Sequence, residues 1–218
     1  MDYLSIVYDR NLKPKTNYPS LLAKEIFRRF NFAKGNSFLE IGCGNGDLLN
    51  EFALLGLEVS GTDLLASAAN DYPYLILKKN NIEKEPLPFK ENIFNIVFSK
   101  SVVEHIYNPE CFFNEALRVL KPGGMLITLT PDWEMQTKKF FDDWTHKTPF
   151  TKVTMQRLYS VAGFKSLKIE YFKQLPILWK SNFLLKTSNL LAPFIRERES
   201  TKLRWIRERQ ILGCGFKK

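Results

Sequence analysis

The chain of 218 residues has the length of one α/β domain with room for an insertion, and it is short for two full domains. Hydrophobic residues make up 44% of it and aromatic residues 14%, so it can bury a core and general disorder is excluded. The formal net charge of +9 is unevenly placed: residues 1–170 hold 21 Lys and Arg against 20 Asp and Glu, and residues 171–218 hold 11 against 3. Such a basic block is either a solvated face or a contact for an anionic partner, such as nucleic acid, lipid headgroups or a phosphorylated substrate.

The cysteines and the first residues indicate in which cellular compartment the protein is expected. The three cysteines form no CxxC pair, which fits a reducing cytosol and argues against a structural zinc site and a secreted disulfide scaffold. Residues 1–10 lack the apolar stretch of a signal peptide, and no run approaches 18 uninterrupted apolar residues. These features predict a cytoplasmic protein without a membrane span.

The first 131 residues alternate between strands and helices. In chain order, the predicted elements are a helix over 20–32, a strand over 37–41, a helix over 47–55, strands over 57–62, 74–78 and 94–99, a helix over 109–120 and a strand over 125–130. Ser20 is the expected N-cap of the first helix, and Pro109 and a Lys-Pro-Gly-Gly string mark the start and the end of the last one. This alternation indicates a parallel sheet with right-handed crossovers.

The remaining residues follow a looser pattern. Beyond Pro131 comes a loop rich in Trp, Phe and Asp, and then a predicted helix over 151–162 and an alternating strand over 166–172. Residues 174–208 are predicted to be helical and basic, with interruptions at two prolines, and residues 210–216 to form a final strand.

The densest signal is the string Phe-Leu-Glu-Ile-Gly-Cys-Gly-Asn-Gly-Asp over residues 38–47, at a strand-to-helix turn. Glycines there let the backbone approach a ligand, because no Cβ stands in the way. In dinucleotide-binding enzymes this turn has the sequence G-x-G-x-x-G. Here Asp47 occupies the place of the third glycine, which comes one residue early at Gly46. Glu40, two residues before the first glycine, is badly placed for a pyrophosphate and suits a cationic amino-acid ligand.

This E-x-G-x-G-x-G string resembles motif I of the class I S-adenosylmethionine-dependent methyltransferases. Further strings are similar to the ubiquinone/menaquinone-type subgroup, so that the resemblance covers about residues 35–131: Leu-Pro-Phe (87–89), Phe-Asn-Ile-Val-Phe (94–98), Val-Glu-His-Ile (103–106) and Arg-Val-Leu-Lys-Pro-Gly-Gly-Met-Leu-Ile-Thr-Leu-Thr-Pro (118–131). The resemblance implies an α/β fold with a Rossmann-like, seven-stranded, mostly parallel sheet flanked by helices. Two antiparallel strands would close that sheet at 166–172 and 210–216, with a helical insertion before the last strand.

The resemblance also implies a single methyltransferase domain over residues 1–218. Its expected parts are an N-terminal helical lid (1–34), a cofactor-binding core (35–131), an acceptor-side loop, helix and strand (132–172), a basic helical insertion (173–208) and the final strand (209–218).

The cofactor implied by the resemblance is S-adenosyl-L-methionine, whose methionine portion the glycine loop would hold. Asp63, 21 residues after Gly42, would accept hydrogen bonds from the ribose hydroxyls. The family usually has an acid after the third strand, facing the adenine amino group; this chain has Asn80-Asn81-Ile82, and an amide carbonyl can accept the same bond. The expected cofactor-binding residues are Glu40, Gly42, Cys43, Gly44, Gly46, Asp63, Leu64, Asn81, Ile82 and Ser99.

The two histidines are the candidate catalytic residues. His105 follows the fourth strand, near the edge where ligands bind in such sheets. Related O-methyltransferases have there an E-x-x-E-H string implicated in metal binding, but Ser101 replaces its first Glu, so no metal is expected. His146 lies in a Thr-His-Lys-Thr-Pro-Phe-Thr string over 145–151 that resembles methyltransferases of bacterial surface-glycan pathways. Either imidazole can take a hydroxyl proton near neutral pH, and either could instead be structural.

The insertion at 173–208 combines apolar helical residues with eight bases against three acids, a net charge of +5. We expect a lid over the acceptor pocket, whose basic face meets an anionic substrate or makes peripheral contact with the inner membrane surface. The expected acceptor is a small molecule or a lipid- or glycan-linked one. No RNA-binding module is recognisable, so a nucleic acid partner is not expected.

These features predict a methyltransferase that acts at oxygen. Three alternatives stay open: a methyltransferase for RNA or protein, a non-catalytic scaffold that binds S-adenosylmethionine, and a nicotinamide-dependent Rossmann enzyme. The last is disfavoured by Gly46 and Asp47 in the loop.

Overall fold

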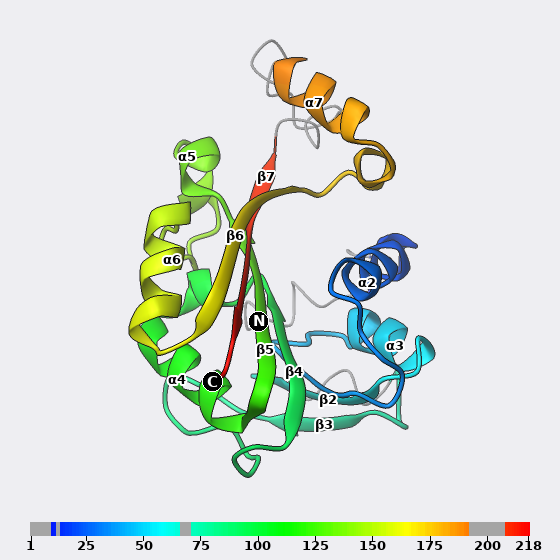
Figure 1. Ribbon diagram of the computed structural model, residues 1–218, viewed down its shortest axis with the longest axis vertical. Coiled ribbons are helices and arrows are strands. Elements are labelled where there is room, and N and C mark those ends of the chain that lie inside the picture. The colour runs from blue at the N-terminus through cyan, green and yellow to red at the C-terminus, as the bar shows by residue number, and fades with distance from the viewer. Residues whose placement is uncertain (1–9, 12–13, 66–70, 192–207) are drawn as a thin grey trace.

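The computed structural model describes residues 10–11, 14–65, 71–191 and 208–218. They form the predicted seven-stranded sheet, in the order β3-β2-β1-β4-β5-β7-β6 (Figure 1). The strands are β1 (Ser37–Ile41), β2 (Glu58–Asp63), β3 (Ile76–Lys79), β4 (Phe94–Lys100), β5 (Leu120–Pro131), β6 (Lys165–Lys173) and β7 (Arg209–Phe216). The fold prediction is confirmed, except that of the last two strands only β7 runs against the parallel set, antiparallel to both β5 and β6.

Helices cover both faces of the sheet (Figure 1). The α-helices are α2 (Tyr18–Arg29), α3 (Asp47–Leu54), α4 (Pro109–Val119), α5 (Trp133–Gln136), α6 (Lys152–Val161) and α7 (Asn182–Leu191), and the 3-10 turns are η2 (Val103–His105), η3 (Phe140–Asp142) and η4 (Pro176–Lys180). Helices α2 and α3 pack on one face, where Phe38, Phe52 and Phe98 stack. Helices α4 and α6 pack on the other face, around Phe113 and Tyr159. Burial of both faces explains the nearly continuous apolar runs of the central strands.

The strand order places the functional edge of the sheet. From β1 the chain moves outward through β2 to β3, and then returns to place β4 on the other side of β1. The connections after β1 and after β4 therefore leave in opposite directions, and a crevice opens between them at the carboxyl ends of the strands. The glycine loop follows β1, and Lys100 ends β4.

Two predicted boundaries were wrong. Helix α2 begins at Tyr18 with Asn17 at the N-cap position, not Ser20, because Pro19 fixes the backbone of the first turn. Strand β5 begins at Leu120 and includes the Lys-Pro-Gly-Gly string that was expected to be a turn. Leu120 already pairs with Phe94, and the register then shifts before Ile96, so the string is absorbed as an irregularity of the strand.

The insertion is only partly described. Its residues 176–180 form η4, which begins at the predicted interruption at Pro176, and its residues 182–191 form α7. The rest of the predicted helical segment, residues 192–207, lies outside the described residues.

Candidate cofactor and acceptor site

The glycine loop has a backbone that favours glycine. Gly42, Gly44 and Gly46 have φ angles of 76°, 53° and 74°, in the left-handed region. A Cβ added to Gly42 would lie 2.1 Å from Cγ2 of Val102, so the loop also packs directly against the segment after β4. A larger residue at position 42 would be strained and would push this segment away.

The N–H groups of the loop are used inside the protein. Those of Gly42 and Cys43 donate to the carbonyl of Thr62 at 2.7 and 3.0 Å, and that of Gly44 donates to the Asp63 carboxylate at 2.8 Å. The N–H of Gly46 donates to the carbonyl of Cys43. A pyrophosphate-binding loop directs such groups at its ligand. These four groups point to the protein, which argues against a nicotinamide dinucleotide and agrees with the sequence-based expectation.

Asp63 ends β2 beside the loop, as predicted. Its side chain is buried (8% exposed) and also accepts a hydrogen bond from the N–H of Leu65 at 3.2 Å. A carboxylate has about four lone-pair positions, so it can accept from ligand hydroxyls as well as from backbone N–H groups. Asp63 thus fixes the loop and can serve a ligand at the same time.

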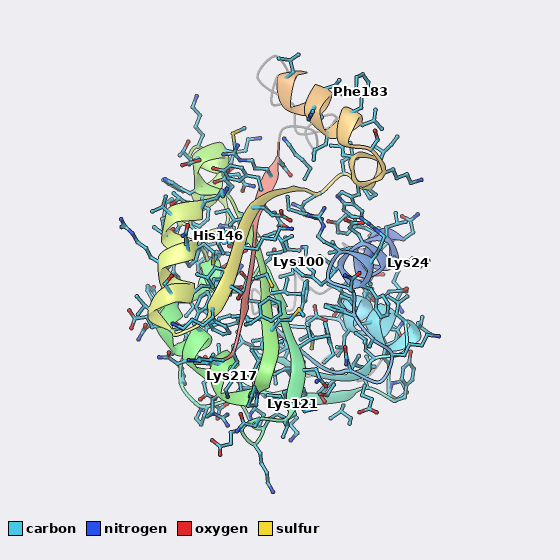
Figure 2. All side chains as sticks on the ribbon, in the orientation of Figure 1. Lys24, Lys100, Lys121, His146, Phe183 and Lys217 are labelled. Carbon is cyan, nitrogen blue, oxygen red and sulfur yellow. The ribbon has the colours of Figure 1, made fainter. Side chains whose placement is uncertain are left out.

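A pocket of about 320 Å³ lies between the glycine loop and the N-terminal part of the chain. Its wall is formed by Arg10, Pro14, Thr16, Tyr18, Pro19, Leu22, Glu40, Cys43, Asn45, Asp47, Leu48 and Lys100. Arg10 binds Asp47 through two hydrogen bonds of 2.6 and 2.8 Å and so closes one side. Lys100 lies between the sheet and α2 (Figure 2). The pocket therefore brings together cations and carboxylates, as an amino-acid ligand requires.

Glu40 is the buried acid of this pocket. It is 3% exposed, and its Oε2 has no hydrogen-bond partner among the described residues. Burial raises the pKa of this carboxyl to about 8, although the positive charge of Lys100 opposes the shift. A buried carboxylate without a partner is costly, so a cationic ligand group would be stabilised there.

The affinity for S-adenosylmethionine is expected to rise with pH between about 5.5 and 7. In this window the ligand amino group keeps its proton, whereas Glu40, with a pKa of about 8, must lose its proton to pair with it. Binding should therefore release up to one proton and strengthen by up to about tenfold per pH unit. Calorimetry in buffers of different ionisation enthalpy measures both quantities.

The variant Glu40→Gln provides the comparison, because the amide has nearly the shape of the carboxyl group but does not titrate. It should bind more weakly and with a flat pH dependence. A wild-type protein that releases no proton would show that Glu40 does not pair with the ligand.

The residues that were expected near the adenine have contacts within the protein or are exposed. Asn80 follows β3 and donates its amide to the carbonyl of Pro86 at 3.0 Å, and the side-chain oxygen of Asn81 accepts from the N–H of Glu83 at 3.1 Å. Ile82 packs on the core, and Leu64 is 43% exposed. Their cofactor contacts remain predictions.

Ser99 has a structural contact. It is buried, and its hydroxyl donates to the carbonyl of Ile41 at 2.9 Å, which joins β4 to β1. Its expected contact with the cofactor stays a prediction.

The two histidines come together at the same edge of the sheet. His105 lies in η2, directly after β4, and His146 lies in the loop that follows β5; their ring centroids are 4.7 Å apart. Glu104 lies beside them, fully buried, with Oε2 bonded to Thr130 at the end of β5 and Oε1 without a partner among the described residues. Burial raises the pKa of Glu104 to about 7.

Hydrogen bonds set the tautomer of each imidazole. A carbonyl only accepts, so Nδ1–H of His146 donates to the carbonyl of Phe140 at 2.5 Å. The Thr145 hydroxyl donates to Asp143 at 2.6 Å, and its oxygen accepts from Nδ1–H of His105 at 3.0 Å. Each neutral ring then keeps its lone pair on Nε2. Burial and the neighbouring His146 lower the pKa of His105, which favours the neutral form.

The same group could hold a metal ion. Among the described residues, Glu104, His105 and His146 each offer a ligand atom, and these atoms lie within 4.8 Å of one another. The absence of a metal was predicted from Ser101, and that prediction remains untested. The third possible ligand, His146, comes from the loop after β5 and lies outside the segment that corresponds to the E-x-x-E-H string.

Three residues of the site were not predicted from the sequence: Lys100, Glu104 and Arg10. Lys100 and Glu104 lie at and just after the end of β4, where ligands bind in open α/β sheets, and this rule could have identified them. Arg10 belongs to the polar leader, where no local pattern indicates a contact with Asp47.

Comparison with known proteins supports the methyltransferase class that the sequence predicts. The profile of the family described as "Methyltransferase domain" matches residues 39–128. A ubiquinone biosynthesis O-methyltransferase of Maricaulis maris is 30% identical over 104 residues, which are 44% of this chain and 41% of that protein. Another, from Nitrobacter winogradskyi, is 34% identical over 115 residues, 49% of this chain and 44% of that protein. The chain thus spans less than half the length of these curated relatives.

A solved structure extends the similarity to the whole fold. A SAM-dependent methyltransferase from Archaeoglobus fulgidus superposes with a TM-score of 0.67 at 20% identity, covering 99% of this chain and 100% of that one. The strand order and the glycine loop with its acid define a class I methyltransferase fold. Residues 39–128 thus match the methyltransferase domain family, the chain has the fold of the S-adenosylmethionine-dependent methyltransferases, and the cofactor that these similarities indicate is S-adenosylmethionine.

The pocket residues fit this cofactor. Glu40 suits the amino group, Lys100 suits the carboxylate, and Asp63 beside the pocket suits the ribose hydroxyls, whereas Arg10 is held by the carboxylates of Asp47 and Asp71. Among the described residues, no helix is long and apolar enough to cross a membrane.

Proposed function

We propose that the protein transfers a methyl group from S-adenosylmethionine to a hydroxyl oxygen of a small molecule, or of a lipid- or glycan-linked acceptor. The observation that carries this proposal is the pair of imidazoles, His105 and His146, with their Nε2 lone pairs set by hydrogen bonds beside the end of β4. The names of the relatives, ubiquinone biosynthesis O-methyltransferases, support oxygen as the methylated atom.

The proposed chemistry divides between the two parts of the site. When bound, the cofactor supplies a methyl group on a positively charged sulfur. Glu40 and Asp63 hold and orient the donor. The acceptor oxygen forms a bond to the methyl carbon as the bond to sulfur breaks, and its proton passes to Nε2 of one imidazole. Alignment of the two reactants and removal of the proton are the tasks of the protein in such a displacement.

Ligand binding tests the first half of the proposal. In calorimetry the purified protein should bind S-adenosylmethionine and S-adenosylhomocysteine and should not bind NAD, because the loop N–H groups are used internally. NAD binding without S-adenosyl ligand binding would contradict it.

An acceptor screen with a labelled methyl group tests the second half, with phenolic and sugar hydroxyls as the main classes. Labelling of small hydroxyl compounds is expected. Labelling that requires RNA or protein would show a macromolecular methyltransferase, and tight cofactor binding without any turnover would indicate a scaffold.

A further inference from the structure

The insertion between β6 and β7 stands at the same edge of the sheet as the candidate site. The start of β7 pairs with the end of β5, as Gln210 with Pro131, so the segment between β6 and β7 leaves from the carboxyl ends of the parallel strands. Figure 1 shows α7 beyond this end of the sheet, clear of the helices that flank it. The turn η4 anchors the segment: the Trp179 indole donates to the carbonyl of Lys173 at 2.7 Å and its ring contacts Tyr18 and Phe172.

Beyond this anchor, η4 and α7 expose large apolar side chains. Phe183 is 73% exposed, Leu190 72% and Ile177 58%. Phe183 and Leu190 are seven residues apart and therefore share one face of the helix. Ser188, on the opposite side, is buried. Leu185, three residues before Ser188, is half-buried, so the described part of the helix packs with these two residues and exposes Phe183 and Leu190 on the other side.

The charged residues of η4 and α7 are all basic. Lys186 lies three residues after Phe183 and four before Leu190, on the same side of α7, and Lys180 ends η4; both are exposed. Residues 171–196 contain no Asp or Glu. Exposed apolar side chains flanked only by bases suit a surface that is apolar inside and anionic outside, as an anionic lipid bilayer is. A nucleic acid would use the bases but not the apolar side chains.

We propose that η4 and α7 form a docking surface for an anionic lipid bilayer, with Phe183, Leu190 and Ile177 inserted at the headgroup level and Lys180 and Lys186 at the phosphates. A protein docked in this way has the carboxyl ends of its parallel strands, where His105 and His146 lie, turned toward the membrane. The proposal does not depend on methyl transfer, since it concerns a surface outside the pocket.

Co-sedimentation of the full chain with vesicles tests the proposal. One set contains phosphatidylcholine with about 30% phosphatidylglycerol, and the other phosphatidylcholine alone. The protein should bind the anionic vesicles and lose most binding in about 1 M salt, where the Debye length falls to about 3 Å. Phe183→Ser with Leu190→Ser should lower partitioning at least about tenfold, because their apolar surface no longer enters the interface. Lys180→Gln with Lys186→Gln should lower it about 25-fold, at about fivefold per base.

The matched control is Leu54→Ser with Val161→Ser, which removes apolar side chains that are 71% and 72% exposed on α3 and α6. This variant should bind anionic vesicles like the wild type. Melting curves check that each variant stays folded, which their exposed positions favour. Absence of wild-type binding at low salt, or equal binding by the Phe183/Leu190 variant, would overturn the proposal. Tighter binding of an RNA homopolymer than of anionic vesicles would overturn it in favour of nucleic acid.

Discussion

Replacing Asp63 with alanine is expected to weaken the binding of S-adenosylhomocysteine by about 5- to 150-fold, equivalent to about 1–3 kcal/mol, the range for a buried hydrogen-bonding group that loses its partner. The effect has two sources. The ribose hydroxyls lose an acceptor, and the N–H of Gly44, which donates to Asp63 at 2.8 Å, is no longer held in place. Isothermal calorimetry measures the change.

Two further variants separate these sources. Asp63→Asn keeps one acceptor oxygen for the Gly44 N–H and should lose less affinity than alanine. Asp142→Ala, an exposed aspartate on η3, serves as the matched control and should bind like the wild type. Thermal unfolding shows whether each variant is folded. Unchanged affinity in a folded Asp63→Ala protein would remove Asp63 from the cofactor site.

The second large effect is expected at His146. Once an acceptor has been found, His146→Ala should lower kcat by about 10²- to 10⁴-fold, the usual contribution of a positioned proton acceptor. Binding of S-adenosylhomocysteine should stay within about threefold, since His146 does not line the cofactor pocket. Single-turnover rates and calorimetry provide the two measurements.

The control must separate proton transfer from the structural role of His146, whose Nδ1–H bonds to Phe140. His146→Asn can still donate to that carbonyl but cannot take a proton. If His146 acts as the base, asparagine is as slow as alanine and added imidazole partly restores the alanine variant. If asparagine retains full activity, the role is structural. Loss of wild-type activity on chelation, restored by Zn²⁺ or Mn²⁺, would show that the histidines act as metal ligands instead.

Sequence patterns were most informative where the signal is local. All seven strands were predicted, six of them within two residues at each end, because buried β-rich runs stand between glycines and prolines. The strand end at Asp63 followed from the same pattern. The start of β5 was missed because pairing of Leu120 with Phe94 overrides a string that favours a turn.

The proximity of Glu104, His105 and His146 could not be predicted from local patterns. Nothing near His105 in the sequence indicates that Thr145, 40 residues later, bonds to its ring, or that one oxygen of Glu104 has no partner in the described part of the chain. Such contacts depend on how the loop after β5 folds back, with the N–H groups of Lys147 and Thr148 donating to the carbonyl of Glu104. Each histidine was identified separately, and their proximity is a result of the structure.

The pairing of β6 with β7 has a consequence for how the insertion between them can vary. Lys173 and Arg209, which flank the insertion, are partners in the ladder, so the two ends of the intervening segment are held about 5 Å apart by the sheet itself. Any segment whose ends meet at that spacing can be grafted there without altering the register of the strands. Doubling the length of such a graft costs only about 0.6 kcal/mol of closure entropy. The insertion can therefore change in length and sequence while the sheet and the glycine loop stay unchanged.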